Sequence, residues 1–436
     1  MRRMIANYIK VRPTLKMKYY ALRKVLKGEL SIKTVLSNFQ RKIKLKSGLV
    51  RRESVSLDNL MIGQQAGIPL EQWIEKTKEY SRISVLLSES PYVDILRLID
   101  ENPAILNNKS EIVNTSYYKM CDVCIKHTGH FMGKKTSRGI LSWIGEYYAF
   151  YQKIKKGSCC KTSSEFSNEG HSKVDDLIQV FKLNNSEYYE IVDGHHRCAI
   201  YYLLGKKTIK SKVLGDKFSY LQRIILGSKQ VFDYEVYQPL DAPEVRDWRL
   251  VRGCDDRLSM MFSFLKKKKI AVSRISYADL PCSYGYFLSA YKKKGSKVRG
   301  IDLDNSSLRI AREINGLTEK EVNKADIMTF LKSSKRYDVV SCLSLLHHFA
   351  LGVVPGSYVS LLEKLDKVTK KVLFLDTGQA HEKQYKGKLD EWTDEFIISE
   401  ILRHTSFKKV IVLGKDHDNV GTQKGDNART LFACVK

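Results

Sequence analysis

Acidic residues recur at the ends of apolar segments in the C-terminal part of the chain. Asp279 ends the segment RISYAD, Asp302 ends VRGID, and Asp326 follows shortly after. A carboxylate at the second of these ends suits hydrogen bonding to ribose hydroxyls, and one at the third can accept from an adenine amino group. The spacing therefore predicts a nucleoside-binding edge. The alternative interpretation is that each acid only caps the helix that follows it.

The segment after Asp279 predicts how the chain would approach such a ligand. The turn LPCSYG leads directly into a helical pattern, and a glycine there allows a tight turn close to the ligand. The proline in this turn fixes φ and removes one N–H donor, which argues for weaker binding. The predicted cofactor-binding residues are Asp279, Pro281, Cys282, Tyr284, Gly285, Asp302, Leu303, Asp326, Ile327 and Leu343.

Two adjacent histidines, His347 and His348, follow the fourth apolar segment of this series. A neutral imidazole at that edge could take a proton from an acceptor hydroxyl, so both are candidate catalytic residues. An anionic acceptor would need no base, only positioning and desolvation. The alternative is a hydrogen-bonded structural pair.

Arginines lie on both sides of this region. Arg249, Arg252 and Arg257 follow Trp248, and Arg429 begins the last apolar segment. Guanidinium groups suit phosphate or carboxylate. Solvation at the surface is an equal alternative for each arginine taken singly.

A second candidate site lies in the middle of the chain, where a strand pattern passes into a helix. The turn carries Asp193, Gly194, His195, His196 and Arg197. Backbone N–H groups at a helix start favour an anion, and the arginine and histidines could add charge. We interpret these five residues as a nucleotide-phosphate site, with Asp193 a weak candidate for contacting a metal or hydroxyl. The alternative is a turn that only stabilises its own helix.

These residues must be positioned by at least two folded units. From about residue 270, strand and helix patterns alternate at the spacing of a doubly wound, Rossmann-like, largely parallel sheet. The segment YQPLDAPEVRDW marks the boundary before it. The predicted organisation is a basic amphipathic leader at 1–56, a mostly helical region at 57–155, a small α+β domain at 156–240 and the α/β domain at 248–436.

Within the helical region, Cys121, Cys124, His127 and His130 occur at three-residue steps. Zinc sites usually separate two ligand pairs by a longer loop, and three-residue steps drift around a helix. We therefore favour a buried helix face over a metal site and assign no metal ligands.

Composition limits the class of protein. The 436 residues are 43% hydrophobic with a net charge of +27, which excludes a wholly disordered chain. No stretch is long and apolar enough for a spanning helix, and the start lacks the apolar run of a secretory signal. Nine scattered cysteines do not form a secreted disulfide framework, so we expect a reducing cytoplasm.

The charge is concentrated at the N-terminus. Residues 1–52 hold 16 Lys and Arg and one acid, Glu29, which gives 16 − 1 = +15. Apolar residues recur there at three or four positions, as in an amphipathic helix. Such a leader can bind an anionic membrane surface and place the protein on the inner face of the cell membrane. Nucleic acid is the less favoured partner, and a basic extension packed on the next domain is the alternative.

Residues 248–436 resemble the class I S-adenosylmethionine-dependent methyltransferases. The resemblance rests on Asp279 with Gly285, Asp302, Asp326 and the segment DVVSCL in order. It implies S-adenosylmethionine as cofactor, with the nucleoside-binding residues named above holding it. The family's first loop usually has glycine where this chain has Pro281 and Ser283, although YGYF resembles related members. This departure makes a degenerate, scaffold-like methyltransferase fold a third possibility.

Residues 173–214 are similar to the ParB/sulfiredoxin fold, whose phosphate-binding turn carries Gly, His and Arg at these places. The form DGHHR resembles nucleotide-using members, including small-molecule kinases. Sulfiredoxins have their catalytic Cys in the turn, where this chain has histidines. The resemblance implies ATP or another nucleotide with Mg, and no disulfide chemistry.

The resulting hypothesis is a methyltransferase that acts on an oxygen of a glycan, glycolipid or phosphorylated sugar, as in enzymes of bacterial surface-polysaccharide gene sets, with a coupled phosphorylation by the middle domain. The alternative is an RNA methyltransferase or a nucleic-acid-associated ParB-like protein. The +15 leader favours that alternative, whereas the missing helix-turn-helix after the ParB-like segment argues against it.

Overall fold

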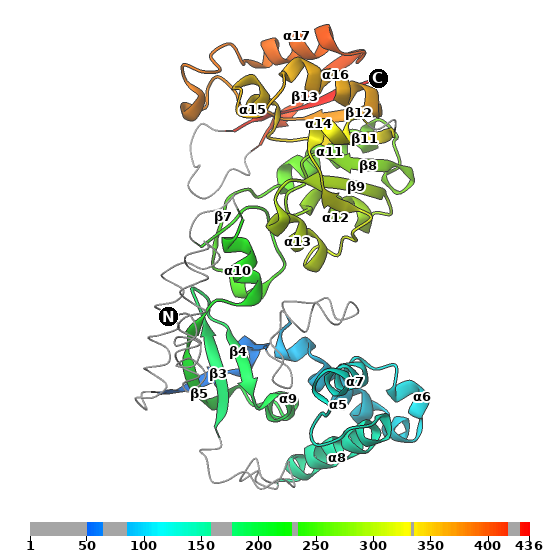
Figure 1. Cartoon of the computed structure of the whole chain (residues 1–436), viewed down its shortest axis with the longest axis vertical. Helices are drawn as coiled ribbons and strands as arrows, with labels where there is room; N and C mark the ends of the chain where they lie inside the picture. Colours follow the sequence, from blue (N-terminus) through cyan, green and yellow to red (C-terminus); the bar gives the residue numbers. More distant parts are fainter. Residues whose placement is uncertain (1–49, 64–84, 158–176, 229–233, 333–334, 417–427) are drawn as a thin grey trace, which may run out of the picture.

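The computed structural model describes residues 50–63, 85–157, 177–228, 234–332, 335–416 and 428–436. The larger sheet has seven strands and the smaller one five. Figure 1 shows the larger sheet with its helices at one end of the molecule and the smaller sheet with a group of helices at the other. The predicted leader helix and most of the polar loop predicted near residue 160 lie outside the described residues.

The C-terminal sheet confirms the predicted doubly wound fold. Its strand order is β10-β9-β8-β11-β12-β14-β13. The first five of these strands are parallel, whereas β14 runs antiparallel to both of its neighbours. The strands are β8 (Ser276–Asp279), β9 (Lys297–Asp302), β10 (Val322–Lys324), β11 (Tyr337–Cys342), β12 (Thr369–Leu375), β13 (Lys409–Lys415) and β14 (Thr430–Val435).

Two groups of helices cover the two faces of this sheet (Figure 1). The first face packs against α11 (Asp255–Lys267), α12 (Tyr286–Lys293) and α13 (Asn305–Glu313). The second packs against α14 (Ile327–Phe330), α15 (Leu346–Ala350), α16 (Tyr358–Val368) and α17 (Asp394–His404). Apolar residues at helical spacing explain this packing, as in α16, where Leu361, Leu362 and Leu365 are fully buried.

The middle sheet has the order β1-β5-β3-β4-β2. Its strands are β1 (Arg51–Ser56), β2 (Leu60–Ile62), β3 (Ile178–Leu183), β4 (Tyr189–Asp193) and β5 (Thr208–Lys217). Ser56 and Leu60 are close in sequence yet belong to the two outer strands. Four residues span at most about 14 Å, whereas four strand spacings of a flat sheet need about 19 Å. The sheet must therefore curl.

This sheet crosses the domain boundaries predicted from the sequence. β1 lies in the segment assigned to the leader, and β2 lies in the segment assigned to the helical region. The boundary was missed because β1 and β2 are short, and their partners are far along the chain. The helical region is accordingly an insertion between β2 and β3.

The inserted helices are α5 (Pro91–Glu101), α6 (Lys109–Ile112), α7 (Ser116–Thr128) and α8 (Ser137–Lys155). They share one hydrophobic core with the middle sheet and with α9 (His195–Leu203). Cys121 and Cys124 are fully buried in this core, as expected for a buried helix face, and burial raises the pKa of the Cys124 thiol to about 12. His130 is exposed, and in the described part of the chain no group of three His, Cys, Asp or Glu could hold a metal ion.

A connector joins the two ends of the molecule. It contains α10 (Tyr220–Leu226), β6 (Glu235–Val236) and β7 (Arg249–Leu250), and its apolar residues form a cluster with Ile310 of α13. Ser228, just after α10, donates a hydrogen bond from Oγ to Oδ2 of Asp304 at 2.9 Å. The connector thus contacts the C-terminal domain two residues after Asp302. None of the described helices has both the length and the apolarity to cross a membrane.

Candidate functional site

The carboxyl ends of β8, β9 and β11 meet at one edge of the C-terminal sheet, where the strand order reverses. Ligands of open α/β sheets bind at such a switch point. Asp279 at the end of β8 pairs in register with Ser341 of β11, whose Oγ donates to Asp279 Oδ1 at 2.5 Å. Burial raises the pKa of Asp279 to about 7, because a charged carboxylate is poorly solvated there.

Asp302 lies at the end of the neighbouring strand β9. Its Oδ2 accepts from the Ser283 N–H and its Oδ1 from the Asp304 N–H, both at 2.9 Å. Burial raises the pKa of Asp302, although the backbone donors act against this shift. A further backbone donor, Leu303, also acts on this carboxylate. Because a carboxylate has about four lone-pair sites, the side chain can still accept from another donor.

The loop between β8 and α12 folds tightly against this carboxylate. Ser283 has a φ of 47° and Gly285 a φ of 76°, both in the left-handed region. A Cβ added to Gly285 would lie 2.5 Å from Leu317 Cδ1, so glycine is required by both conformation and space. Cys282 and Tyr284 are buried, and Pro281 is only partly buried.

The remaining predicted cofactor residues lie around the same edge with different exposures. Leu303 is 62% exposed beside Asp302, whereas Ile327 and Leu343 are buried. Asp326 is exposed and accepts from the Thr329 N–H at 2.9 Å, which makes it the N-cap of α14. In this structure the Asp326 side chain thus caps the helix that follows it, which was the alternative to adenine binding.

The two histidines after β11 are in different surroundings. His347 is 1% exposed and its Nδ1 accepts from the Gly378 N–H at 3.0 Å. That bond assigns the proton to Nε2, and burial with nearby Arg429 lowers the pKa of His347 to about 2. His348 is partly exposed, and burial lowers its pKa as well. Both rings are therefore neutral at physiological pH; His347 is held by the fold, whereas His348 can reach a ligand.

Three of the arginines predicted from the sequence form one buried cluster at this edge. Arg252, Arg257 and Arg429 are each 5% exposed or less. Arg429 donates from Nη1 to Ser344 Oγ at 2.9 Å, and Arg252 donates from Nη2 to the same oxygen at 3.3 Å. The solvation alternative is therefore wrong for these three. Arg249 instead forms an ion pair with Glu235, and Trp248 is buried in the connector.

The cluster is neutralised by acids that the sequence reasoning missed. Asp376, which follows β12, forms an ion pair with Arg257 at 2.9 Å and accepts from the Ser344 N–H at 2.6 Å. Glu382 accepts two hydrogen bonds from Arg429, each at 2.9 Å. Asp416 lies 3.6 Å from Arg252. Asp376 closes a strand as Asp279 and Asp302 do, so the strand-end rule could have found it.

The turn between β4 and α9 has the backbone expected of the second candidate site. Gly194 has a φ of 97° and is the N-cap residue of α9, so the chain makes a left-handed turn directly into the helix. A Cβ there would meet Ile178 at 2.8 Å. Arg197 lies 3.4 Å from the exposed Asp193 carboxylate, which places opposite charges beside the turn.

The histidines of this turn need a correction to their predicted role. His195 is 8% exposed and stacks on Tyr92, with ring centroids 5.2 Å apart. His196 Nε2 lies 2.6 Å from Tyr117 Oη, within a group of five aromatic rings. Burial lowers the pKa to about 4 for His195 and about 3 for His196. Both rings are thus neutral and directed into the helical insertion, where they cannot add positive charge to a phosphate site. The five rings around His196 are those of Tyr92, Tyr117, Phe131, Trp143 and Tyr147.

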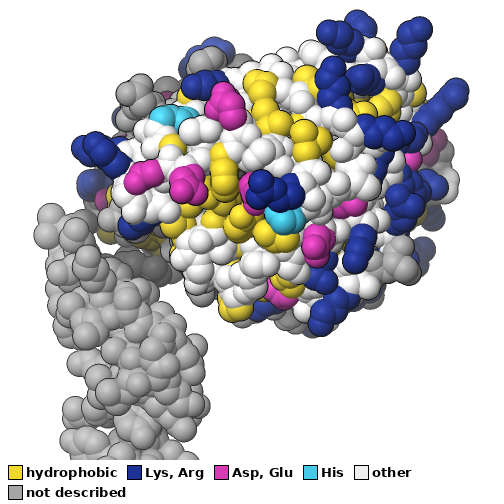
Figure 2. Space-filling model, turned by 90° about the horizontal axis from the view of Figure 1, so that it is seen from above, with side chains coloured by type: hydrophobic (Ala, Val, Ile, Leu, Met, Phe, Trp, Pro, Cys, Tyr) yellow, Lys and Arg dark blue, Asp and Glu magenta, His cyan; other side chains and the backbone are white. Residues whose placement is uncertain are grey.

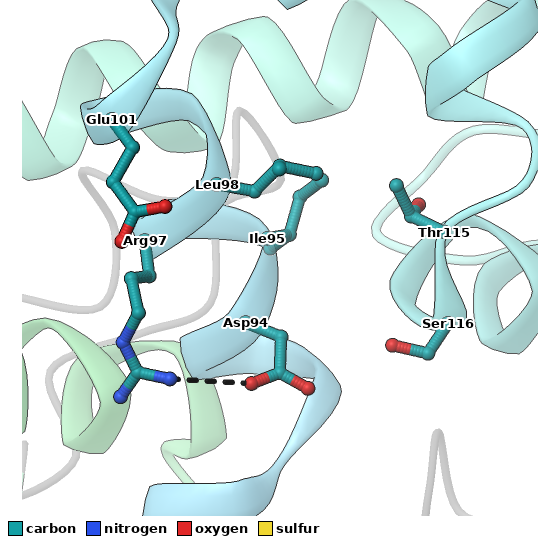
Figure 3. A pocket seen from close by; sticks show the side chains of 7 residues that line it. All are labelled: Asp94, Ile95, Arg97, Leu98, Glu101, Thr115 and Ser116. Atoms are coloured by element: carbon teal, nitrogen blue, oxygen red, sulfur yellow. Dashed lines mark ion pairs between the residues drawn. The ribbon is translucent and has the colours of Figure 1, made fainter.

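A hollow of about 310 Å³ lies elsewhere, between α5 and the start of α7 (Figure 3). Arg97 and Asp94 line it and face each other across 3.6 Å, with Thr115 and Ser116 on the opposite wall. None of the candidate site residues lines it. The hollow is therefore not part of either candidate site.

Comparison with known proteins defines the class of the C-terminal domain. Residues 278–377 match the family model described as a methyltransferase domain. This segment runs from the end of β8 through β12 and includes the edge built around Asp279 and Asp302. The core of the C-terminal sheet therefore has the fold of a methyltransferase domain. No curated protein matches the chain.

Solved structures are similar over less than half of the chain. A crystal structure of WbdD is 20% identical, with a TM-score of 0.39 over 49% of this chain and 46% of that one. Another structure of that protein describes it as a bifunctional kinase-methyltransferase, 18% identical with a TM-score of 0.39 over the same shares. The N-terminal domain of EvdMO1, crystallised with S-adenosylhomocysteine and D-fucose, is 17% identical, with a TM-score of 0.31 over 42% of this chain and 83% of that one.

Proposed function

We propose that this protein transfers the methyl group of S-adenosylmethionine to an oxygen of a glycan, glycolipid or phosphorylated sugar. The observation that carries the cofactor assignment is the Asp302 carboxylate, which is held at the switch point by the Ser283 N–H and keeps a lone pair for a further donor. The acceptor class rests on the resemblance of the chain to enzymes of bacterial surface-polysaccharide gene sets.

The residues present fit this cofactor. Gly285 and Gly300 leave no space for a Cβ, so the backbone beside Asp302 is as close-packed as a nucleoside-binding loop requires. Asp302 would hold the ribose hydroxyls. The exposed face of Leu303 and the buried Leu343 would contact the adenine and the methionine parts. When bound, the cofactor supplies an electrophilic methyl group on a sulfonium.

The acceptor side would be formed by the residues after β11 and β12. His348 is neutral and partly exposed, so it can take a proton from an acceptor hydroxyl. His347 would act as a positioning residue, since the Gly378 N–H fixes its ring against that of His348, with centroids 4.2 Å apart. The charge-balanced arginine cluster beneath them would hold this part of the site rigid.

A calorimetric titration tests the cofactor assignment. S-adenosylmethionine should bind the wild type in the micromolar range, and Asp302→Ala should weaken binding about tenfold or more, roughly 1.4 kcal/mol. Glu319→Ala is the control because Glu319 is exposed in the loop before the amino end of β10, away from the carboxyl edge; it should change affinity by less than about threefold. A folded wild type that does not bind would reject the assignment and favour a scaffold role for the domain.

We also propose a nucleotide-phosphate site at the turn before α9. The left-handed turn at Gly194, which starts α9, and the neighbouring Arg197 support it. In this proposal the contacts come from the backbone and Arg197, and the two histidines only anchor the turn. Titration with ATP and Mg²⁺ should show binding that Arg197→Ala weakens. If labelled phosphate is never transferred to any acceptor tested, the domain binds nucleotide without acting as a kinase.

A further inference from the structure

The edge of the methyltransferase sheet opposite the candidate site is crowded with exposed basic residues. These residues lie where the chain enters the strands, at the amino ends of β8, β9, β11, β12 and β13. Figure 2 shows Lys and Arg side chains gathered along one flank of the molecule, the right side of that view. We call this set the amino-edge face: Lys266, Lys267, Lys268, Lys269, Lys293, Lys294, Lys297, Lys332, Lys335, Arg336, Lys367, Lys370, Lys371, Lys408 and Lys409.

Few carboxylates on this edge neutralise the face. Among the described residues, Lys371 pairs with Asp338 at 3.4 Å, and the neighbouring Lys436 pairs with Asp366 at 2.6 Å. The four consecutive lysines at 266–269, by contrast, end α11 and extend into solvent. Like charges on adjacent loops repel one another and lower stability. A partner that carries dense negative charge would relieve this repulsion.

The side chains of the face favour a diffuse anionic surface over a nucleic acid. Lysine dominates, and its ammonium group acts as a point charge without the planar fork that suits bidentate base or phosphate recognition. Lysines lie over two aromatic rings at this edge: Lys294 is 5.2 Å from the partly buried Phe262 ring, and Lys268 is 5.8 Å from the buried Phe264 ring. Single-stranded nucleic acid would require such rings to be exposed for base stacking.

We propose that the amino-edge face binds the surface of an anionic lipid bilayer. Each lysine near such a surface contributes about 1 kcal/mol, and the attraction falls off within a Debye length. Because the strands are parallel, their carboxyl ends point away from a bilayer bound at their amino ends. The candidate site would then face the cytoplasm and receive a group at the far end of a lipid-linked chain rather than one next to its lipid.

Flotation of the full-length protein with vesicles tests this surface. Binding to vesicles of phosphatidylcholine and phosphatidylglycerol is expected, with little binding to phosphatidylcholine alone. Replacing Lys267, Lys293, Lys370 and Lys408 together by glutamine should weaken binding about tenfold or more. All four are exposed and distant from the carboxyl edge, so binding of S-adenosylmethionine should not change.

Two further variants make the result decisive. The matched control replaces Lys109, Lys135, Lys207 and Lys210, which are exposed on the helical insertion and the middle sheet; vesicle binding should remain within about twofold of wild type. The other variant neutralises Arg2, Arg3, Lys16 and Lys18 of the leader. If only the leader variant loses binding, the amino-edge face is not a membrane surface. Binding to RNA or duplex DNA without binding to anionic vesicles would also overturn the proposal.

Discussion

The backbone N–H of Ser283 donates to Asp302 Oδ2 at 2.9 Å and thereby joins the loop after β8 to the end of β9. The contact is made by the main chain, so it does not depend on the serine side chain. It explains how a loop that contains Pro281 can still approach the predicted ribose-binding carboxylate. Pro281 removes an N–H two residues earlier, and the donor that holds Asp302 is retained.

Ser283→Gly should stabilise the protein while leaving cofactor affinity unchanged. Ser283 has a φ of 47°, and a non-glycine residue in this region costs about 1–2 kcal/mol. Glycine removes this conformational cost, but its greater entropy in the unfolded chain offsets part of the gain in stability. We expect a gain of about 0.5–1 kcal/mol in the free energy of unfolding, measured with urea. Ser344→Gly is the contrasting variant: its φ is 56°, yet its hydroxyl accepts from two buried arginines, so it should destabilise.

Asp279→Asn should change how stability depends on pH. The folded pKa of Asp279 is about 7, raised by burial from an ordinary value of 3.8. The unfolded chain therefore loses this proton at lower pH than the folded protein, and the group disfavours folding increasingly from about pH 4 to pH 7. Asparagine removes this contribution and can still accept from Ser341. We compare the free energies of unfolding of the variant and the wild type. Their difference should shift in favour of the variant by about 1–3 kcal/mol from pH 5 to pH 8, measured by urea unfolding at both pH values. An equal effect at the two pH values would contradict the assignment.

Asp376→Asn should be strongly destabilising. The carboxylate is fully buried; burial alone would raise its pKa, but Arg257, Arg429 and Arg252 hold the pKa below its ordinary value. The variant removes the carboxylate that lies 2.9 Å from the buried Arg257, and loss of one partner of a buried ion pair typically costs about 3–5 kcal/mol. Asp216→Asn, in an exposed pair with Arg51, should cost less than about 1 kcal/mol. Denaturant unfolding of both variants checks the difference.

His196→Gln should make the free energy of unfolding depend less on pH below pH 6.5. The folded pKa of His196 is lowered to about 3 by burial, from 6.5. Above pH 6.5 the His196 ring is neutral in both the folded and the unfolded chain, and its contribution to the free energy of unfolding is fully present. As the pH falls from 6.5 toward 3, the unfolded chain takes up a proton that the folded protein does not, so this contribution is lost. The difference in the free energy of unfolding between wild type and His196→Gln should therefore shrink by about 1.4 kcal/mol for each pH unit below 6.5. The exposed His130→Gln is the control and should retain the wild-type profile.

The sequence predicted the elements of the C-terminal domain because each is a local pattern. Segments such as RISYADL and YDVVSCLS have the short apolar runs of buried parallel strands, and they became β8 and β11. Asp279 and Asp302 follow from the same rule, since parallel strands place their carboxyl ends at one edge. Asp376 follows β12 and obeys the same rule. It was not predicted as a strand-end acid, and the arginine cluster that pairs with it was therefore not predicted either.

The features that the sequence did not predict depend on contacts between distant segments. The direction of His196 is set by aromatic rings from α5, α7 and α8, and no spacing within the HHR motif encodes it. The partner of β1 is likewise β5, on the other side of the helical insertion. Pairings of this kind follow from the packing of the whole domain, which a pattern confined to one window of sequence cannot specify.

The insertion of the helices between β2 and β3 has a consequence for how the protein is made. Leu60 pairs with Tyr189 and Ser56 with Thr208, so the first two strands leave the ribosome long before their partners exist. The intervening helices make mostly local contacts and can form during this wait, whereas the curled sheet closes late. A nascent chain that stops near residue 157 would expose two unpaired strands, which are templates for aggregation. The C-terminal sheet, whose strands follow one another along the chain, avoids this delay.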